Sequence, residues 1–174
     1  ISAVVTFIAT LVIGFDDPVE ESNDINHNLM NNVKSPISGK ILDLNSVNDE
    51  MFSKEVLGKG VALIPNDNKV YSPVEGIISA TFETKHAIGI TTDKNMEILI
   101  HIGIDTVKFG GKPFKQFVEK GQRVKQGDLL IEFDKELLKQ GDADLTTMVV
   151  ITNSNDYLEI IPKKAPKGQA YLQK

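Results

Sequence analysis

Residues 84–105, with the sequence TKHAIGITTDKNMEILIHIGID, combine two β-prone runs with a polar turn. The first run ends at Thr91, and the second begins at Met96. Between them stand Thr, Asp, Lys and Asn, which are typical turn residues. The pattern predicts an antiparallel hairpin, with Asp93 and Lys94 as a two-residue loop.

The predicted hairpin brings two histidines together. A two-residue loop would place His86 opposite His101 and Ile88 opposite Leu99. Directly opposed residues have Cβ atoms roughly 4.5–5.5 Å apart, so two of the three histidines in the chain would share one small area. A shift of one residue would send the two rings to opposite faces of the sheet, so the prediction depends on the length of the loop.

Two adjacent imidazoles suggest chemistry near neutral pH, where a neutral ring is a nucleophile, a general base and a metal ligand. One ring could accept a phosphoryl group on a ring nitrogen while the other donates hydrogen bonds to the phosphoryl oxygens. Thr84 stands two residues before His86, and its hydroxyl could orient that ring. The alternative is a pair of hydrogen-bonded histidines in a half-buried sheet, and the pattern alone leaves both possibilities open.

Composition narrows the class of protein. The chain of 174 residues has room for one domain plus tails, and a hydrophobic content of 41% allows a real core. The net charge of −5 argues against a nucleic-acid partner, which would require a basic surface. Because the chain has no cysteine, disulfides, thiol catalysis and thiolate metal sites are excluded.

The two ends of the chain differ from the middle. Residues 1–15 carry no charge, but a membrane-spanning helix needs about 20 residues. We interpret them as the truncated end of a transmembrane segment, with a buried strand as the alternative. Residues 16–32 contain five acids and no Lys or Arg, which is typical of a flexible linker. Residues 163–174 form a basic tail.

The domain itself is expected at residues 33–162, where short β-branched runs alternate with Gly, Pro, Asn and Asp. This spacing predicts an all-β fold, a compact and barrel-like antiparallel β-sandwich. One or two short helices are expected at residues 50–57 and 134–140. The strand candidates are KSPISGKILDL, KGVALIP, KVYSPVEGIISATFET, MEILIHIGI, RVKQGDLLIEFD and TTMVVITN.

An internal echo predicts two similar half-sheets that face each other. Residues 35–41, SPISGKI, resemble residues 72–78, SPVEGII. In each copy proline fixes the entry to the strand and glycine permits a tight bend. Residues 118–133, VEKGQRVKQGDLLIEF, further predict a hairpin with two glycine turns.

Taken together, residues 33–162 resemble the glucose-type enzyme IIA domain of the bacterial phosphoenolpyruvate-dependent sugar phosphotransferase system. The paired motifs FETKHA and HIGIDTV are the specific part of the resemblance, and SPISGKI, YSPVEGII, FVEKGQRVKQGDLLIEFD and VVITN are its scaffold. The stretch TFIATLVIGFDDP resembles the end of the membrane-embedded IIC domain that precedes IIA in fused β-glucoside- or sucrose-type permeases.

The resemblance implies a phosphotransferase with a phosphohistidine intermediate in a shallow depression. His101 would accept a phosphoryl group from the phosphocarrier protein HPr and pass it to a IIB domain, whose cysteine phosphorylates sugar during transport. His86 would support the phosphate, and Thr84 would orient His86. No cofactor, no metal and no nucleic acid would take part. The domain would work at the cytoplasmic face of the membrane, attached through the preceding IIC domain.

A docking surface for partners is implied around the histidines. The residues that match its apolar rim or the motif after His101 are Phe52, Val56, Phe82, Gly103, Asp105 and Val107. Ile88 and Leu99 would lie on the histidine face and help exclude water, although a phenylalanine is common near there in the family. Asp49 and Asp105 would flank the site with negative charge and could steer a basic partner.

Three other classes of function stay open. A biotinyl- or lipoyl-like carrier would modify a lysine at an exposed turn such as Lys94, but the flanking methionines common in such domains are absent. A zinc hydrolase needs about three protein ligands, and His86 and His101 supply two, so Asp105 or a partner's carboxylate would have to be the third. A regulatory binding protein could use the same two histidines in an interfacial zinc site.

Overall fold

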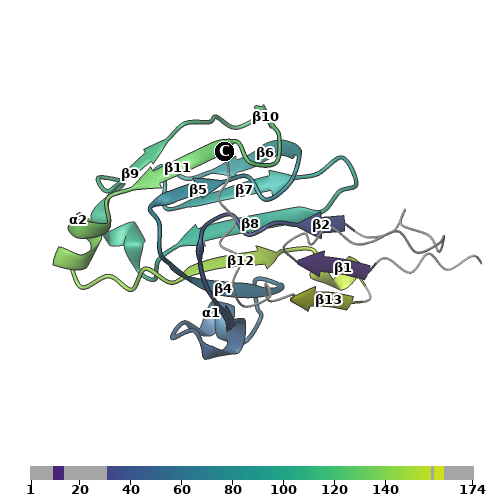
Figure 1. Cartoon of the computed structure of the whole chain (residues 1–174), viewed down its shortest axis with the longest axis horizontal. Helices are drawn as coiled ribbons and strands as arrows, with labels where there is room; N and C mark the ends of the chain where they lie inside the picture. Colours follow the sequence, from purple (N-terminus) through teal and green to yellow (C-terminus); the bar gives the residue numbers. More distant parts are fainter. Residues whose placement is uncertain (1–9, 14–30, 158, 163–174) are drawn as a thin grey trace, which may run out of the picture.

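The computed structural model describes residues 10–13, 31–157 and 159–162, and its strands form three sheets (Figure 1). The largest sheet has seven strands, and every neighbouring pair in it is antiparallel. Its strands, in spatial order, are β10 (Arg123–Val124), β6 (Gly76–Thr81), β7 (Ala87–Thr91), β8 (Glu97–Ile102), β12 (Thr147–Ile151), β4 (Lys59–Pro65) and β3 (Gly39–Asp43).

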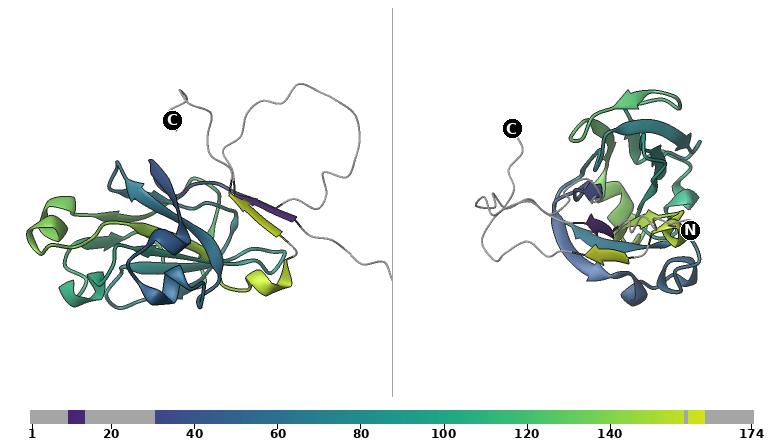
Figure 2. Two further views of the ribbon diagram at one scale, coloured as in Figure 1. Left: turned by 90° about the horizontal axis from the view of Figure 1, so that it is seen from below. Right: turned by 90° about the vertical axis from the view of Figure 1, so that its right-hand side faces the viewer.

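The second sheet packs against the first and completes the sandwich. It is antiparallel and consists of β5 (Lys69–Tyr71), β11 (Leu129–Phe133) and β9 (Phe114–Gln116). The third sheet is parallel and consists of β13 (Glu159–Pro162), β1 (Thr10–Ile13) and β2 (Asn31–Val33). The all-β sandwich is therefore confirmed, whereas the small parallel sheet was not predicted. Figure 2 shows this small sheet at one end of the molecule.

Both helices expected at residues 50–57 and 134–140 are present, and the first is shorter than predicted. Helix α1 (Glu50–Ser53) begins after Asp49, whose side chain accepts a hydrogen bond from Met51 N at 2.8 Å. Helix α2 (Lys135–Gln140) is capped in the same way by Asp134 and is followed by Gly141. Short 3₁₀ turns occur at η2 (Leu44–Ser46), η3 (Thr106–Phe109) and η4 (Ser154–Asp156).

The large sheet is covered on both faces. One face carries Ile88, Ile98 and Ile100, which belong to the main core together with Leu130 and Phe133 of β11. The opposite face carries a smaller cluster, to which η2 and α1 contribute. The buried members of this second cluster are Leu44, Val47, Phe52, Ala62, Met148 and Val150. Because alternate residues of a strand point to opposite faces, Leu99 and His101 lie on this second side.

The two Ser-Pro repeats have the same local structure. Ser35 Oγ donates to Ile37 O at 2.7 Å, and Ser72 Oγ donates to Val74 O at 2.7 Å. In each copy the serine hydroxyl thus bonds a carbonyl two residues later, which closes a small turn before the strand.

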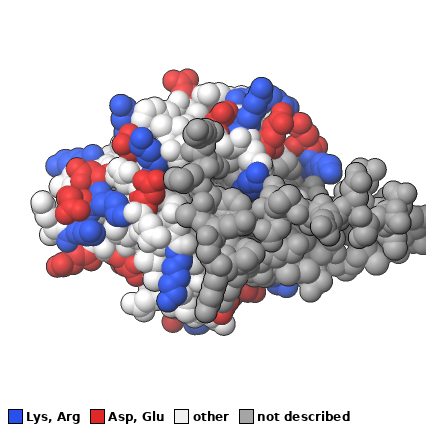
Figure 3. All heavy atoms as spheres, viewed as in Figure 1, with Lys and Arg blue, Asp and Glu red and all other residues white. Residues whose placement is uncertain are grey.

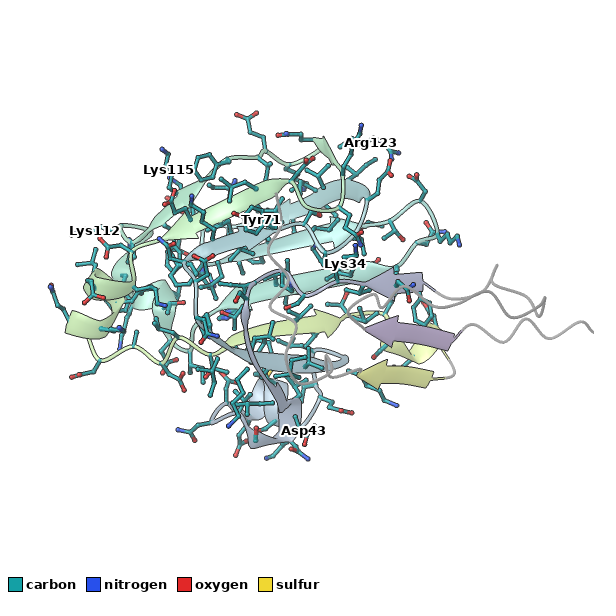
Figure 4. All side chains as sticks on the ribbon, in the orientation of Figure 1. Lys34, Asp43, Tyr71, Lys112, Lys115 and Arg123 are labelled. Atoms are coloured by element: carbon teal, nitrogen blue, oxygen red, sulfur yellow. The ribbon has the colours of Figure 1, made fainter. Side chains whose placement is uncertain are left out.

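The repeats also bond to each other reciprocally. Lys34 N donates to Pro73 O at 3.0 Å, and Tyr71 N donates to Pro36 O at 2.8 Å. In each case the residue before one repeat contacts the proline of the other, so the two copies face each other with local two-fold symmetry. Lys34 and Tyr71 are labelled in Figure 4. The duplication of the Ser-Pro turns is confirmed, whereas the strands that follow them, β3 and β6, belong to one sheet and not to two half-sheets.

Residues 118–133 do not form the predicted hairpin. Gly121 and Gly127 occupy turns with φ values of 88° and 92°, as expected. However, β10 pairs with β6, whereas β11 pairs with β5 and β9. The second glycine turn therefore carries the chain from one sheet to the other. Turn residues mark where a chain reverses, but they do not reveal which strand the next segment joins.

Most residues of the segments predicted before and after the domain, 1–32 and 163–174, lie outside the described residues. Of residues 1–15, Thr10–Ile13 are described, and they form the strand β1. Of the predicted linker, residues 31 and 32 belong to β2, and the basic tail from residue 163 is not described. No helix within the described residues is long and apolar enough to cross a membrane.

Candidate active site

The turn between β7 and β8, closed by Thr92 and Met96, encloses three residues (93–95) instead of the two predicted. Thr92 N donates to Met96 O at 3.0 Å, and Asn95 adopts a left-handed conformation with φ 60°. This is the geometry of a three-residue hairpin loop. The register consequently shifts by one, and Ala87 faces His101. The predicted register was wrong.

The two histidine rings nevertheless meet. His86 precedes β7, directly after Lys85, which has a left-handed φ of 56°. Ile102 N donates to His86 O at 2.8 Å, so the backbone of His86 stays attached to the end of β8. The ring centroids of His86 and His101 lie 4.7 Å apart, with the rings nearly perpendicular at 81°. The predicted proximity is confirmed, although Ala87, and not His86, stands directly opposite His101.

His101 is held in one tautomer by a backbone carbonyl. Its Nδ1 lies 2.9 Å from Gly103 O. A carbonyl oxygen can only accept a hydrogen bond, so Nδ1 carries the proton and the lone pair of the neutral ring is on Nε2. Gly103 has a φ of 74°, a left-handed conformation that suits glycine.

His86 is fixed by a side chain, as predicted. Thr84 Oγ1 lies 2.6 Å from His86 Nδ1. The hydroxyl is able to donate or accept in this bond, so the contact is compatible with both tautomers of the ring. When the hydroxyl donates, the proton of His86 is on Nε2, where it is available to a negatively charged oxygen.

Both rings are kept neutral near pH 7. The pKa of His101 is lowered to about 4, chiefly by burial and in addition by the neighbouring His86 ring. The Gly103 carbonyl and the side chains of Asp49 and Asp105 act in the opposite direction, since they favour a positive charge on His101. Burial also lowers the pKa of His86. An unprotonated, partly desolvated imidazole is a competent nucleophile.

Two residues expected in the docking surface lie elsewhere. Ile88 is fully buried in the main core and faces Ile100, because the true register places it on the opposite side of the sheet from His101. Phe52 is only 3% exposed, and its ring centroid lies 5.2 Å from that of His101. Phe52 therefore packs beneath the histidine and offers almost no surface to a partner.

Other apolar residues do remain exposed. Val56, Phe82 and Val107 are among the exposed large hydrophobic residues, at 61%, 42% and 55%. The Phe82 ring centroid is 5.7 Å from that of His86. Met51 is also exposed and was missed, since an apolar residue next to Phe52 on α1 looks like core from sequence alone. Leu99 is partly buried against the second cluster.

The alternatives gain little from the geometry. Within the described residues, no group of three or more His, Cys, Asp or Glu side chains is placed to hold a metal ion. The two histidines alone would have to be completed by a partner. Lys94 lies in an exposed position at the β7–β8 turn, where a carrier lysine would be expected.

Comparison with known proteins places the chain among phosphotransferase-system proteins. Residues 31–157 match the family "phosphoenolpyruvate-dependent sugar phosphotransferase system, EIIA 1". The chain therefore belongs to this EIIA family, and its domain is a phosphotransferase component of that system. The family resemblance seen in the sequence is confirmed.

The chain is similar to three longer proteins, each named "PTS system beta-glucoside-specific EIIBCA component". It is 44% identical over 136 residues to that of Dickeya chrysanthemi, covering 78% of this chain and 22% of the relative. For Halalkalibacterium halodurans the identity is 45% over 125 residues, with coverages of 72% and 20%. For Bacillus subtilis it is 41% over 152 residues, with coverages of 86% and 25%. The chain thus spans a fifth to a quarter of the length of these relatives.

A solved structure shares the fold. The chain superposes on the glucose permease IIA from Mycoplasma capricolum with a TM-score of 0.65 and a sequence identity of 40%. The match covers 69% of this chain and 78% of the permease domain.

Proposed function

We propose that His101 accepts a phosphoryl group on Nε2 from the phosphocarrier protein HPr and passes it to a IIB domain. The observation that supports this most directly is the hydrogen bond from His101 Nδ1 to Gly103 O. That bond leaves the lone pair on Nε2, beside the second ring, in a histidine that burial keeps unprotonated.

The transfer step needs no net movement of a proton. The Nε2 lone pair attacks phosphorus, the bond between phosphorus and the donor atom breaks, and its electron pair returns to the donor. The proton on Nδ1 stays in place, so the phosphorylated ring carries a positive charge next to the negative phosphoryl oxygens. The Gly103 carbonyl, Asp49 and Asp105 stabilise this charge, as they favour the protonated ring in the free protein. Such catalysis relies on position and charge.

His86 has the position of a supporting donor. Its ring lies 4.7 Å from His101, centroid to centroid, and Thr84 holds its Nδ1. With the Thr84 hydroxyl donating, His86 Nε2–H is free to donate to a phosphoryl oxygen on His101. Burial lowers the pKa of His86, and a phosphoryl dianion beside it would raise that pKa again.

Partners would dock on the apolar rim that remains exposed. Phe82 lies beside His86, and Val56, Val107 and Met51 are further exposed apolar residues that a partner could cover. A partner seated on this rim excludes water from the transfer step, which limits hydrolysis. The negative charge of Asp49 and Asp105 would favour a partner with a basic surface. Phe52 supports the His101 ring by packing beneath it.

The names of the relatives support a wider setting for the domain. All three are called beta-glucoside-specific EIIBCA components. We therefore propose that this EIIA domain serves the uptake of a β-glucoside, with IIB and IIC domains in the same polypeptide and the IIA domain at the cytoplasmic face of the membrane.

The test is phosphorylation with phosphoenolpyruvate, enzyme I and HPr. We expect a single phosphate that is labile to acid and stable to base, and we expect His101→Ala to remove it. His27→Ala, which deletes the third histidine, is the matched control and should be labelled normally. Normal labelling of His101→Ala would show that the phosphate resides elsewhere.

The roles of the two histidines are separated by His86→Gln. This variant keeps a hydrogen-bond donor but cannot carry a positive charge. It should accept phosphate from HPr and pass it to a IIB domain slowly, with Thr84→Ala showing a milder defect. Single-turnover transfer from each purified phosphorylated variant measures the effect. Normal forward transfer by His86→Gln, or wild-type label on His86, would reverse the assignment.

A further inference from the structure

The orientation of the Gly103 carbonyl is controlled by hydrogen bonds that involve no histidine. The peptide before Gly103 is held because Thr106 Oγ1 donates to Ile102 O at 2.6 Å. The peptide after Gly103 is held because Ile104 N donates to Asp144 O at 2.8 Å. Both peptide planes that flank Gly103 are therefore fixed, and the second plane contains the oxygen that accepts the proton of His101 Nδ1.

Thr106 is completely buried. No water can replace its hydroxyl at the Ile102 carbonyl, so loss of the hydroxyl would leave a buried acceptor without a partner. The methyl group of Thr106 closes the space beside Gly103, since a Cβ added at Gly103 would collide with Thr106 Cγ2 and lie 2.8 Å from Asp144 O. The hydroxyl and the methyl thus act on neighbouring parts of the same loop.

Asp144 is itself held in a tight turn. Its Oδ1 accepts hydrogen bonds from Thr146 N at 2.8 Å and from Thr146 Oγ1 at 2.6 Å. These bonds fix the backbone just before β12, and with it the carbonyl that receives Ile104 N. Two hydrogen bonds therefore hold the peptides around Gly103. The one to Ile102 O is donated by a single buried side chain, that of Thr106.

We propose that Thr106 is a positioning residue for His101. Its hydroxyl holds the peptide between Ile102 and Gly103, which keeps the Gly103 carbonyl on His101 Nδ1–H and the lone pair on Nε2. Without the hydroxyl, the loop relaxes toward a new partner for the Ile102 carbonyl, and the bond to Nδ1 weakens. The other tautomer then gains population, and its protonated Nε2 cannot attack phosphorus. The consequence for phosphoryl transfer rests on the proposed role of His101.

The experiment uses two pairs of variants that differ by the hydroxyl. Wild type and Thr106→Val form the first pair, and Thr106→Ser and Thr106→Ala form the second, in which both members lack the methyl group. Thr147→Val is the control, because Thr147 is also completely buried and donates to a backbone carbonyl, that of Leu145 at 3.1 Å. The readouts are the ring ¹⁵N chemical shifts of His101 in the unphosphorylated protein and the single-turnover rate of acceptance from HPr.

We expect wild type and Thr106→Ser to show His101 with a protonated Nδ1. Thr106→Val and Thr106→Ala should show a mixture of tautomers and accept phosphate about five- to tenfold more slowly, as expected for the loss of about one hydrogen bond. Thr147→Val should lower stability and leave the His101 shifts unchanged. If Thr106→Val fails to fold, the Ser and Ala variants decide the question.

Three results would overturn the proposal. They are a single Nδ1–H tautomer in both variants without the hydroxyl, equal effects of Thr106→Ser and Thr106→Ala, and a tautomer change in Thr147→Val. The ¹⁵N shifts are measured on protein without phosphate. A failure of this inference is therefore distinguishable from a failure of His101 as the phosphoacceptor, which the labelling experiment tests.

Discussion

Keeping His101 neutral has an energetic consequence that depends on pH. The usual pKa of histidine is 6.5, and in the folded protein that of His101 is about 4. Between these two pH values the unfolded chain binds more protons than the folded one. The free energy of unfolding therefore rises with pH across this window. The stabilising contribution of neutral His101 is completely lost only below pH 4.

We expect His101→Asn to flatten this dependence, because asparagine does not titrate. One pKa unit corresponds to about 1.4 kcal/mol, so the wild type should lose up to about 3 kcal/mol through this group as the pH falls from 6.5 to 4. Urea denaturation at pH 4 to 7.5 measures the slope for both proteins. His27→Asn is the control. Parallel stability curves for wild type and His101→Asn would contradict the lowered pKa.

Several properties of single residues were predictable and others were not. The FETKHA and HIGIDTV motifs correctly predicted that His86, His101 and Thr84 come together. The register was wrong because Asn95 adopts a left-handed conformation, which lengthens the loop by one residue. That choice is a property of the backbone, and the same four turn residues fit both loops. Ile88 was misplaced for this reason.

At the scale of elements, Asp49 has two effects at the start of α1. Its side chain caps the helix by accepting from Met51 N, and its negative charge acts on His101. The helix has only four residues and carries Phe52, which packs beneath the His101 ring. The cap and the charge can be separated, because asparagine caps helices about as well as aspartate does.

We expect Asp49→Asn to slow phosphate acceptance from HPr while leaving thermal stability almost unchanged. Asp49→Ala should show the same kinetic defect and also lose about 1 kcal/mol of stability, which is typical for a lost cap. Stopped-flow association at several salt concentrations, together with thermal denaturation, measures both effects. Equal loss of stability in the two variants would contradict this separation of cap and charge.

Elements with local signals were predicted best. Both helices begin after a capping aspartate, a residue type that favours the start of a helix. Most strands followed from their β-branched runs, and the Ser-Pro repeats from their similarity, whereas β9 has no such run and was not predicted. The partner of β10 was not predictable, since the turn at Gly127 looks the same whether the next strand pairs locally or enters the other sheet. Long-range pairing of this kind is decided by the packing of the whole core.

On the scale of the whole molecule, charges of both signs are interspersed over the described part of the face shown in Figure 3. The net charge of −5 is therefore not gathered into one acidic field on that face. Steering of a basic partner is then a local effect of groups such as Asp49 and Asp105, and salt should screen it over about 10 Å at 0.1 M.

A shortened protein tests how the domain is bounded. A chain of residues 31–162 retains every proposed site residue and the whole stretch that matches the EIIA family. We expect it to accept phosphate at the rate of the full chain. Its melting temperature should fall somewhat, because β1 pairs with both β2 and β13. Labelling kinetics and thermal denaturation measure the two effects. A folded fragment that does not accept phosphate would contradict this boundary.

The small parallel sheet determines how far a covalently attached partner must reach. The chain enters the described domain in β1 and leaves it in β13, and these two strands are neighbours. They lie at one end of the molecule, and β8 points toward the opposite end (Figure 1). His101 is the penultimate residue of the six-residue β8, which is about 20 Å long. A flexible tether covers 20 Å on average with about a dozen residues. If a domain were tethered to this sheet by a shorter segment, it would meet His101 at a low effective concentration. A longer segment would let the EIIA domain move between its phosphate donor and its phosphate acceptor.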